Sequence, residues 1–328
     1  MVNKVTTATV IGLDAYNVSV ETDVLNGIPA FSIVGLPDTA INEARDRVRS
    51  AIKNSGFTFP AKKVVINLAP ADLKKEGSIF DLPIAVGLLV EEEVLAEEKL
   101  KDFAFIGELS LDGSLRGVTG VLPLILGLKS HGIKNVFVPK INASEAALAG
   151  DVNIFGVNCL CDVVNHFADS KITPTTIDIQ NYLEEGAKQD YLYDFKDVKG
   201  QQKAKKALEI AAGGGHNMLM IGSPGSGKTL MAKCFASILP PLELQEALEL
   251  TKIYSISGLL SPDEPLMTKR PFRAVHHTAS ANGIIGGGTM PKPGEITLAH
   301  RGVLFLDEMV EFPRNVLEVL RQPLEDGE

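Results

Sequence analysis

The stretch that decides the fold reads GSPGSGKT and spans Gly222–Thr229. It fits the pattern G-x-x-x-x-G-K-[ST] in full, with an apolar run, Asn217–Ile221, before it and a helical pattern, Thr229–Leu239, after it. A strand before and a helix after are the context in which this pattern predicts a phosphate-binding loop. Glycines let the backbone turn successive N–H groups toward an anion, and the N-terminus of the helix adds partial positive charge.

The loop predicts ATP and Mg²⁺ as cofactors. Lys228 is expected to reach the β- and γ-phosphates, and the Thr229 hydroxyl is expected to bind Mg²⁺. A plain glycine turn between strand and helix is the structural alternative, but such a turn does not need the lysine and the threonine together. The residues expected to contact the nucleotide in this loop are Gly222, Ser223, Pro224, Gly225, Ser226, Gly227, Lys228 and Thr229.

A second motif, VLFLDE, spans Val303–Glu308. Its four consecutive apolar residues predict a strand buried on both faces, as in a parallel sheet. Two carboxylates follow at the carboxyl end of this strand, where ligands of open α/β sheets bind. Asp307 is predicted to join the Mg²⁺ shell, and Glu308 to orient and polarise the attacking water. Together with Lys228, these two carboxylates are the predicted catalytic residues.

The composition is that of an ordinary globular protein, with 45% hydrophobic and 22% charged residues. This excludes a disordered chain. No apolar run reaches the roughly 18 residues of a membrane helix, and the first residues lack the pattern of a signal peptide. The 3 cysteines argue against a disulfide framework, so we expect a cytoplasmic protein that binds no membrane. The net charge of −9 gives no support for nucleic-acid binding, although a local basic patch could still hold phosphates.

The chain is expected to form two α/β domains joined by a linker. Residues 1–170 alternate strand-like runs with helical patterns such as Thr39–Ser55, which Asp38 can cap. Residues 171–193 are polar, have no long period and predict the linker. Residues 194–328 hold both motifs, and we expect them to form a parallel sheet around the phosphate-binding loop.

Segments on both sides of the motifs resemble the AAA+ ATPases of the magnesium-chelatase-like branch, and the YifB/ComM family in particular. They are DFKDVKGQQKAKKAL (194–208), RPFRAVHHTASANGIIGGGTMPKPGEITLAHRGVLFLDE (270–308) and EFPRNVLEVLRQPLEDGE (311–328). The resemblance implies an ATP-dependent ring that remodels DNA by branch migration, so a homo-hexamer and DNA are the expected partners. It also implies that Val198 and Gly200 lie near the adenine. Ser223 stands where the family often has proline, at a position that contributes only backbone.

The same resemblance implies that Pro271–Gly294 is an insertion that faces the pore of the ring. Its three consecutive glycines, residues 286–288, predict a pliable hairpin between Pro291 and the core. His276 and His277 would point to opposite faces of a strand, so a metal site that also uses His300 is a weak alternative. A solvated charged surface is the alternative to phosphate contacts for the basic residues around the insertion, Arg270, Arg273, Lys292 and Arg301.

Residues 1–170 resemble the ribosomal-protein-S5-like fold of the Lon protease domain. The likeness is carried by NLAPADLKKEGSIFDLPIAVG (67–87) and IGELSLDGSLRGVTGVLPLILGLKSHGIKNVFVP (106–139). It aligns Asp81 with the protease serine and Leu122 with the lysine base, while Ser78 lies nearby but outside the matched position. Leucine cannot accept a proton, so the resemblance predicts a domain without protease activity or protease substrates. We expect this domain to serve assembly or partner binding.

The chain ends 20 residues after Glu308, before the sensor, arginine finger and lid that the AAA+ resemblance implies. We therefore expect an N-terminal fragment with a truncated AAA+ core, which binds ATP better than it hydrolyses it. Arg314 and Arg321 are implied to belong to the helix after the second motif and are not assigned as arginine fingers. The alternatives are a magnesium-chelatase motor subunit and a non-catalytic nucleotide-binding regulatory protein. The N-terminal domain argues against the chelatase, because chelatase motors begin near their phosphate-binding loop.

Overall fold

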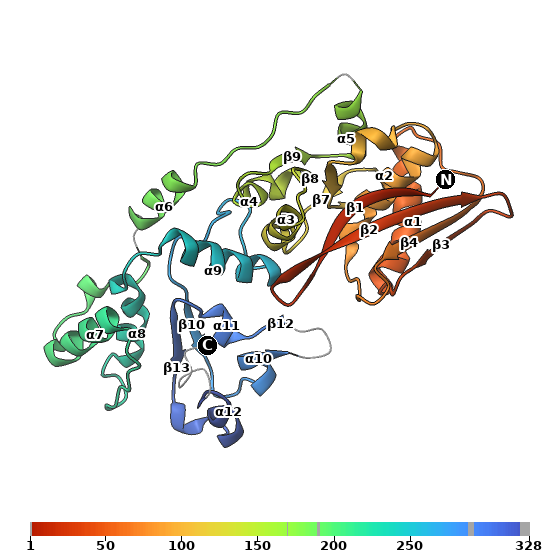
Figure 1. Ribbon diagram of the computed structural model, residues 1–328. Helices are drawn as coiled ribbons and strands as arrows, with labels where there is room; N and C mark the ends of the chain where they lie inside the picture. The colour runs from red at the N-terminus through yellow and green to blue at the C-terminus, as the bar shows by residue number, and fades with distance from the viewer. Residues whose placement is uncertain (1, 169, 189–190, 288–291, 322–328) are drawn as a thin grey trace. The chain divides into compact units, whose positions relative to one another are not determined.

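The chain divides into two compact units, drawn in Figure 1. The first unit comprises Met1–Ile177 and the short segment Gly258–Pro265, and the second comprises Asp178–Ser257 and Leu266–Glu328. The boundary between Ile177 and Asp178 therefore falls inside the predicted linker, residues 171–193. The computed structural model describes residues 2–168, 170–188, 191–287 and 292–321.

A seven-stranded mixed sheet forms the centre of the first unit, in the order β3-β4-β2-β1-β5-β8-β9. β1 pairs antiparallel with β2, and β2 with β4, whereas the other four neighbouring pairs are parallel. Two shorter strands, β6 and β7, pair with each other. The strands are β1 (Asn3–Ile11), β2 (Asp14–Leu25), β3 (Ala30–Val34), β4 (Lys63–Ala69), β5 (Phe103–Phe105), β6 (Glu108–Leu109), β7 (Leu115–Arg116), β8 (Asn135–Pro139) and β9 (Asn153–Val157).

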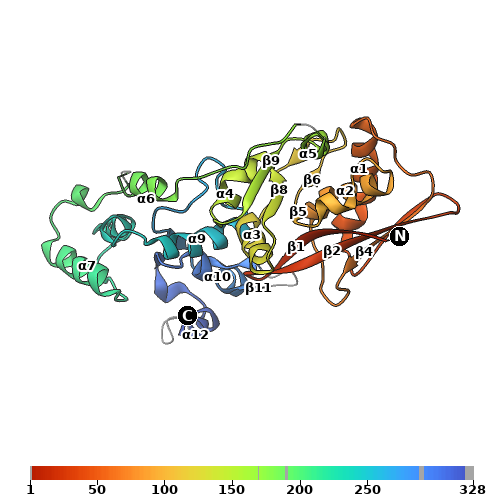
Figure 2. The same cartoon turned by 45° about the horizontal axis from the view of Figure 1, so that its top comes forward.

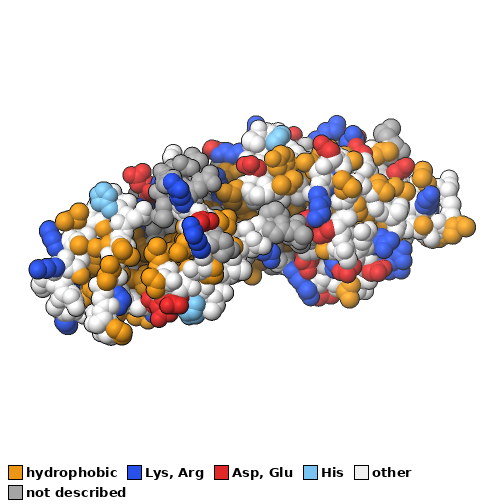
Figure 3. Space-filling view, turned by 90° about the horizontal axis from the view of Figure 1, so that it is seen from below, with side chains coloured by type: hydrophobic (Ala, Val, Ile, Leu, Met, Phe, Trp, Pro, Cys, Tyr) orange, Lys and Arg blue, Asp and Glu red, His pale blue; other side chains and the backbone are white. Residues whose placement is uncertain are grey.

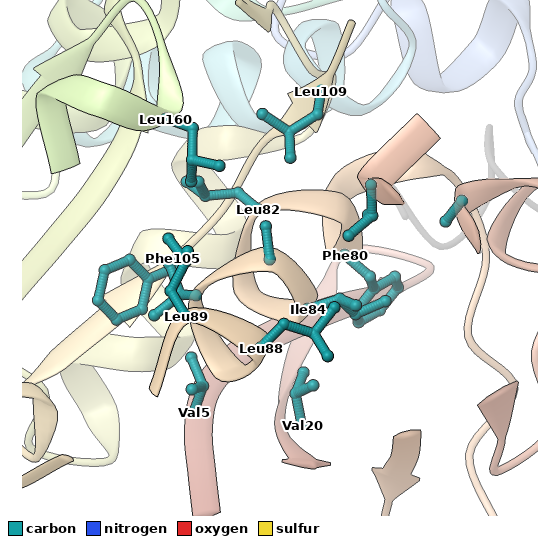
Figure 4. Packing of buried hydrophobic residues seen from close by; sticks show 14 of the residues in the cluster. Val5, Val20, Phe80, Leu82, Ile84, Leu88, Leu89, Phe105, Leu109 and Leu160 are labelled. Atoms are coloured by element: carbon teal, nitrogen blue, oxygen red, sulfur yellow. The ribbon is translucent and has the colours of Figure 1, made fainter. Parts of the chain in front are cut away.

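Amphipathic and apolar helices cover this sheet, as Figures 1 and 2 show for α1 and α2. The Asp38 carboxylate caps α1 by accepting a hydrogen bond from the N–H of Ile41 at 2.8 Å, as predicted. Figure 4 shows Leu88 and Leu89 of α2 above Val5 and Val20 of the two central strands. The α-helices are α1 (Thr39–Asn54), α2 (Asp81–Glu91), α3 (Val121–Ser130), α4 (Ala143–Ala147) and α5 (Leu160–Phe167).

Two glycines allow helices to lie close to the sheet. A Cβ atom at Gly87 of α2 would lie 2.4 Å from Thr22 Oγ1, and one at Gly127 of α3 would lie 2.5 Å from Ala15 Cβ. Both distances are far shorter than van der Waals contact. A larger residue at either position would push its helix away from β2 and open the core.

The second unit combines helices with two short two-stranded sheets. β10 and β13 pair in parallel, and β11 pairs antiparallel with β12. Its α-helices are α6 (Ile179–Lys188), α7 (Gln202–Gly214), α8 (Lys228–Phe235), α9 (Leu244–Ile256), α10 (Ala281–Ile285), α11 (Glu295–Leu298) and α12 (Arg314–Val319). Its strands are β10 (Phe272–Val275), β11 (Gly286–Gly287), β12 (Lys292–Pro293) and β13 (Val303–Leu306).

Short 3₁₀ helices occur in both units. They are η1 (Ser78–Phe80), η2 (Glu97–Leu100), η3 (Lys140–Asn142), η4 (Phe195–Asp197), η5 (Ala236–Ile238) and η6 (Met309–Glu311). None of the described helices has the length and apolar character needed to cross a membrane.

The predicted strand before the phosphate-binding loop is wrong. Asn217–Ile221 forms no strand, and Leu219 and Ile221 are 70% and 89% exposed. An apolar run becomes a strand only where a neighbour supplies backbone hydrogen bonds, and within the described residues β13 pairs with β10 alone. In Figure 3, hydrophobic side chains reach the surface at the left, on the side of α7 and α8.

Two other predicted elements differ from the structure. The predicted strand Phe103–Leu109 is divided into β5 and β6, because the backbone of Gly107 bonds to Ile79 O at 3.1 Å and to Leu82 N at 3.0 Å instead of continuing the ladder. The predicted linker, residues 171–193, contains α6.

Three features of the sequence explain the helix α6. Asp178 accepts a hydrogen bond from the N–H of Asn181 at 3.1 Å and begins the helix. Ile179 and Leu183 then fall on one face of it. On that face, a Cβ at Gly186 would lie 2.2 Å from Thr268 Cβ, so only glycine allows this approach.

A buried ion pair holds Asp81, the residue that the resemblance to the Lon protease domain is expected to align with the protease serine. Asp81 is fully buried at the start of α2, and its two carboxylate oxygens accept from Nε and Nη2 of Arg47 at 2.7 and 3.0 Å. The N–H of Leu109 donates to the same carboxylate at 3.2 Å. Burial raises the pKa of Asp81 to about 6, although the ion pair with Arg47 acts to lower it. This carboxylate is therefore closed off from substrates and serves the packing of α1 against α2.

We expect the Asp81 carboxyl to reduce the stability of the first unit as the pH rises from about 4 to about 6. The pKa of an unfolded aspartate is about 3.9, so between about pH 4 and pH 6 the folded chain binds more protons at Asp81 than the unfolded chain does. The loss of stability is complete once the pH is above about 6. The difference between the two pKa values corresponds to roughly 3 kcal/mol. Urea unfolding followed by circular dichroism should show that Asp81→Asn removes this pH dependence.

Asp46→Asn, at an exposed position of α1, is the matched control and should keep the pH dependence of the wild type. An Asp81→Asn variant that loses stability with rising pH as steeply as the wild type would contradict this account of the buried carboxyl.

Candidate nucleotide-binding site

The glycine-rich loop has the backbone geometry of an anion cradle. Gly225 and Gly227 have φ angles of +75° and +88°, in the left-handed region that glycine occupies without steric cost. Gly227 is also the N-cap of α8, and its carbonyl accepts from the N–H of Met231 at 2.9 Å. The helix therefore begins directly at Lys228, and its positive dipole end faces the loop.

The lysine of the motif is folded back on the loop. Lys228 Nζ donates to the carbonyl oxygens of Gly222 and Ser223 at 2.9 and 3.1 Å. These neutral acceptors hold the ammonium group at the loop. Phosphate oxygens form stronger, charge-assisted hydrogen bonds, so a bound phosphate could take the ammonium group over.

The two motifs meet in the structure. Thr229 Oγ1 donates to Asp307 Oδ2 at 3.2 Å, although the two residues are 78 positions apart in the chain. Hydroxyl and carboxylate oxygens are the hard ligands that Mg²⁺ prefers. The donor set therefore fits the predicted Mg²⁺ shell, with Thr229 and Asp307 as the residues that could hold the ion.

Glu308 lies beside a histidine that the sequence did not connect with it. Its backbone is in the left-handed region, with a φ of +52°, and its side chain is 65% exposed. Glu308 Oε2 lies 3.4 Å from Nδ1 of His277. The signal that could have found this contact is the parallel pairing of the strands that precede the two residues.

The segment before α7 reaches the loop through a residue that was not predicted. Val198 is buried in a small apolar cluster, and Gly200 has a φ of +69°. The next residue, Gln201, has a φ of +53° and donates from Nε2 to Ser226 O at 3.4 Å. Val198 and Gly200 thus lie on a segment joined to the loop, but no local pattern marks Gln201.

The arginines predicted to meet phosphates are paired with carboxylates instead. Arg273 forms a bidentate pair with Glu295, with N···O distances of 2.6 and 2.8 Å. The other two pairs are Arg270–Glu246 at 2.9 Å and Arg301–Glu249 at 3.2 Å. A guanidinium in such an ion pair contacts a phosphate only after it leaves its carboxylate, so phosphate contact by these three residues stays a prediction.

Lys292 remains exposed on β12. The predicted hairpin is described in part, as the pairing of β11 with β12, while Gly288 and Pro291 lie outside the described residues. Arg314 begins α12, as the resemblance implied, and pairs with Glu318 at 3.1 Å.

The histidines do not form a metal site. The rings of His276 and His277 lie side by side, with centroids 4.0 Å apart and an interplanar angle of 35°, instead of pointing to opposite faces. The alternation of the strand has ended there, because β10 ends at Val275. His300 pairs with Glu249 at 3.3 Å. Within the described residues there is no group of three or more His, Cys, Asp or Glu side chains that could hold a metal ion.

Comparison with known proteins covers nearly the whole chain. Residues 194–328 match the family model of magnesium chelatase, subunit ChlI, and residues 20–142 match that of subunit ChlI of Mg-chelatase. The chain is 46% identical over 319 residues to Competence protein ComM of Haemophilus influenzae, which covers 97% of this chain and 62% of that protein. It is 44% identical over 327 residues to YifB of Escherichia coli, which covers 98% of this chain and 62% of that protein.

The chain belongs to the YifB/ComM family of magnesium-chelatase-like proteins. It spans 62% of the length of these YifB/ComM relatives. An archaeal Lon protease of Halobacterium salinarum is 31% identical over 105 residues, which cover 32% of this chain and 13% of that protein. The predicted fold, an S5/Lon-like α/β domain followed by a P-loop AAA+ region, is therefore confirmed for this YifB/ComM chain, apart from the strand corrected above.

Lys228→Ala should weaken ATP binding by about 10-fold or more, since a hydrogen bond to a charged group contributes about 1.5–3 kcal/mol. AMP, which lacks the β- and γ-phosphates, should lose much less affinity. Isothermal titration calorimetry with both nucleotides measures the difference. Lys206→Ala, an exposed lysine of α7 paired with Glu209, is the matched control. Equal ATP affinity in the wild type and Lys228→Ala would refute the site.

Proposed function

We propose that this chain binds ATP together with Mg²⁺ at Gly222–Thr229 and Asp307, and that Glu308 serves ATP hydrolysis. The observation that carries the proposal is the 3.2 Å contact between Thr229 Oγ1 and Asp307 Oδ2. It joins the two motifs that the sequence singled out independently, one for phosphate and one for the metal. A glycine turn without a ligand gives no reason for this hydroxyl and this carboxylate to converge.

Each residue has a role that follows from its chemistry. Lys228 neutralises charge on the β- and γ-phosphates, and the N–H groups of the loop hold the phosphate oxygens. Thr229 and Asp307 hold the Mg²⁺ ion, which, when bound, screens the phosphate charge. Glu308 accepts a hydrogen bond from the attacking water, so that the oxygen of the water is aimed at the γ-phosphate.

For the longer protein that the relatives represent, we propose ATP-driven remodelling of DNA by a homo-hexameric ring. The support is the family membership and the resemblance of residues 270–328 to the YifB/ComM pattern. The engaged arginines around Pro271–Gly294 leave Lys292 as the exposed cation of that set for phosphate contact. DNA contact through this region is therefore expected to depend on few charges in one subunit and on their repetition around a ring.

A magnesium-chelatase motor is the second candidate, because both family models carry the chelatase name. The match at residues 20–142 removes the argument that an N-terminal domain excludes this role. The two candidates differ in what stimulates ATP hydrolysis. Stimulation by DNA supports the remodelling function, whereas stimulation only by chelatase partner subunits and a tetrapyrrole supports the chelatase.

Glu308→Gln should bind ATP as tightly as the wild type but hydrolyse it about 10²–10⁴ times more slowly, because the amide cannot act as a base. Single-turnover hydrolysis of radiolabelled ATP, with binding measured in parallel, separates the two steps. Glu311→Gln, three residues further on, is the control and should hydrolyse ATP at the wild-type rate. Hydrolysis by Glu308→Gln at that same rate would contradict the proposed role.

Branched DNA should raise the rate of ATP hydrolysis, and the stimulation should fall steeply with added salt because phosphate contacts release counterions. Lys292→Ala should reduce this stimulation several-fold without changing ATP affinity, measured by a coupled ATPase assay. Lys62→Ala, an exposed lysine of the first unit, removes the same charge and serves as control. The DNA proposal fails if hydrolysis is the same with and without DNA.

A further inference from the structure

The parallel pairing of β10 and β13 brings His277 and Glu308 to the same edge of the two-stranded sheet. Val275 lies opposite Leu306 in the register of this pair. His277 and Glu308 each lie two residues beyond this last pair, after the strands have ended. Because the carboxyl ends of parallel strands lie at the same edge, side chains that follow them are presented to the same space. The histidine is thus brought to the carboxylate by the pairing of the strands.

The imidazole of His277 and the carboxylate of Glu308 lie slightly too far apart for a good hydrogen bond. His277 Nδ1 is 3.4 Å from Glu308 Oε2, and the same ring nitrogen is buried with no hydrogen-bond partner in the described residues. A buried polar atom without a partner is costly. The exposed Glu308 side chain can close this gap by a small rotation. Hydrogen bonds of catalytic groups are often long before the ligand binds and shorten when it does.

The imidazole of His277 is held more firmly than the carboxylate it faces. Its ring lies against that of His276 at an interplanar angle of 35° and meets the ring of Phe312 edge-on, with centroids 4.0 and 6.5 Å away. Its side chain is 29% exposed, against 65% for Glu308. The restrained partner therefore sets the position of the freer one.

His276 provides an internal contrast. Its Nδ1 accepts a hydrogen bond from the N–H of Thr278 at 3.3 Å and lies 2.9 Å from the Thr278 hydroxyl. An Nδ1 atom that accepts cannot also carry the proton, so this ring is the Nε2–H tautomer when neutral. Within the described residues no backbone N–H donates to Nδ1 of His277, so this nitrogen can carry the proton and direct it toward Glu308.

We propose that His277 is a positioning residue for Glu308: its Nδ1–H donates to the carboxylate and holds it in the orientation that activates water. The inference rests on the proposed function, because Glu308 has a role only if ATP is hydrolysed. A hydrogen bond from Nδ1–H restricts the rotation of the carboxylate and so keeps one of its oxygens aimed at the water. The left-handed backbone of Glu308 directs the side chain toward this partner.

The first test measures hydrolysis and nucleotide affinity together. His277→Leu should slow single-turnover ATP hydrolysis by about 10-fold or more, with the Kd for ATP unchanged within about twofold. His277→Asn should restore most of the rate, since the amide nitrogen of asparagine occupies nearly the position of Nδ1 and can donate. His131→Leu, the same change at an exposed histidine of the first unit, is the matched control and should stay within about twofold of wild type.

The second test does not depend on turnover. In protein labelled with ¹⁵N-histidine, NMR couplings between ring nitrogens and carbon-bound protons report which nitrogen carries the proton. His277 should be the Nδ1–H tautomer in the wild type and shift toward Nε2–H in Glu308→Ala. His276 should be the Nε2–H tautomer in both.

The outcomes separate this inference from the proposed function. Failure of the wild type to bind ATP would remove the proposed function, while the tautomer measurement still decides whether His277 donates to Glu308. Equal rates for His277→Leu and the control His131→Leu would overturn the positioning role. So would faster hydrolysis in His277→Leu, or a His277 tautomer that does not respond to Glu308→Ala.

Discussion

The candidate site depends on the parallel pairing of β10 with β13. Four residue pairs, from Phe272–Val303 to Val275–Leu306, fix the register of the two strands. His277, Asp307 and Glu308 follow the carboxyl ends of these two strands. His277 therefore lies beside Glu308, and Asp307 accepts a hydrogen bond from Thr229 at 3.2 Å. A shift of one residue in either strand would turn the side chains to the opposite face and dissolve the whole arrangement. The side chains of the site can act together only because the register of these two strands brings them to one place.

Much of this arrangement could be predicted because its signals are local. The glycines of Gly222–Thr229 and the two carboxylates after Val303–Leu306 identify themselves by spacing alone. The helix beginning at Thr39 was predictable from Asp38, whose capping bond is in place. What sequence reasoning missed depends on contacts between distant segments: the ion pairs that engage Arg270, Arg273 and Arg301, and the approach of His277 to Glu308. A positive charge in a sequence gives no sign of whether a carboxylate 22 positions away will bind it, as Glu295 binds Arg273.

The N-terminal unit shows how a Lon-like fold can keep its architecture while changing what lies at one position. Asp81 occupies the start of α2, and its carboxylate is used by Arg47 of α1 and by the N–H of Leu109. A nucleophile must be exposed and must have a base beside it, whereas this carboxylate is fully buried and bonded on both oxygens. Nearby Ser78 is itself hydrogen-bonded to Glu108. At this position the carboxylate of α2 is bonded to an arginine of α1 and is not exposed for reaction.

The extended run Asn217–Ile221 brings the chain to the loop with Leu219 and Ile221 turned to water. Within the described residues this run belongs to no strand, and a run with exposed backbone and large apolar side chains favours the addition of a further strand. The run that leads to Lys228 therefore combines an open backbone with exposed apolar side chains. A strand that paired with this run would restrict the backbone directly before the loop. It would thereby restrict the glycines that must turn toward an anion.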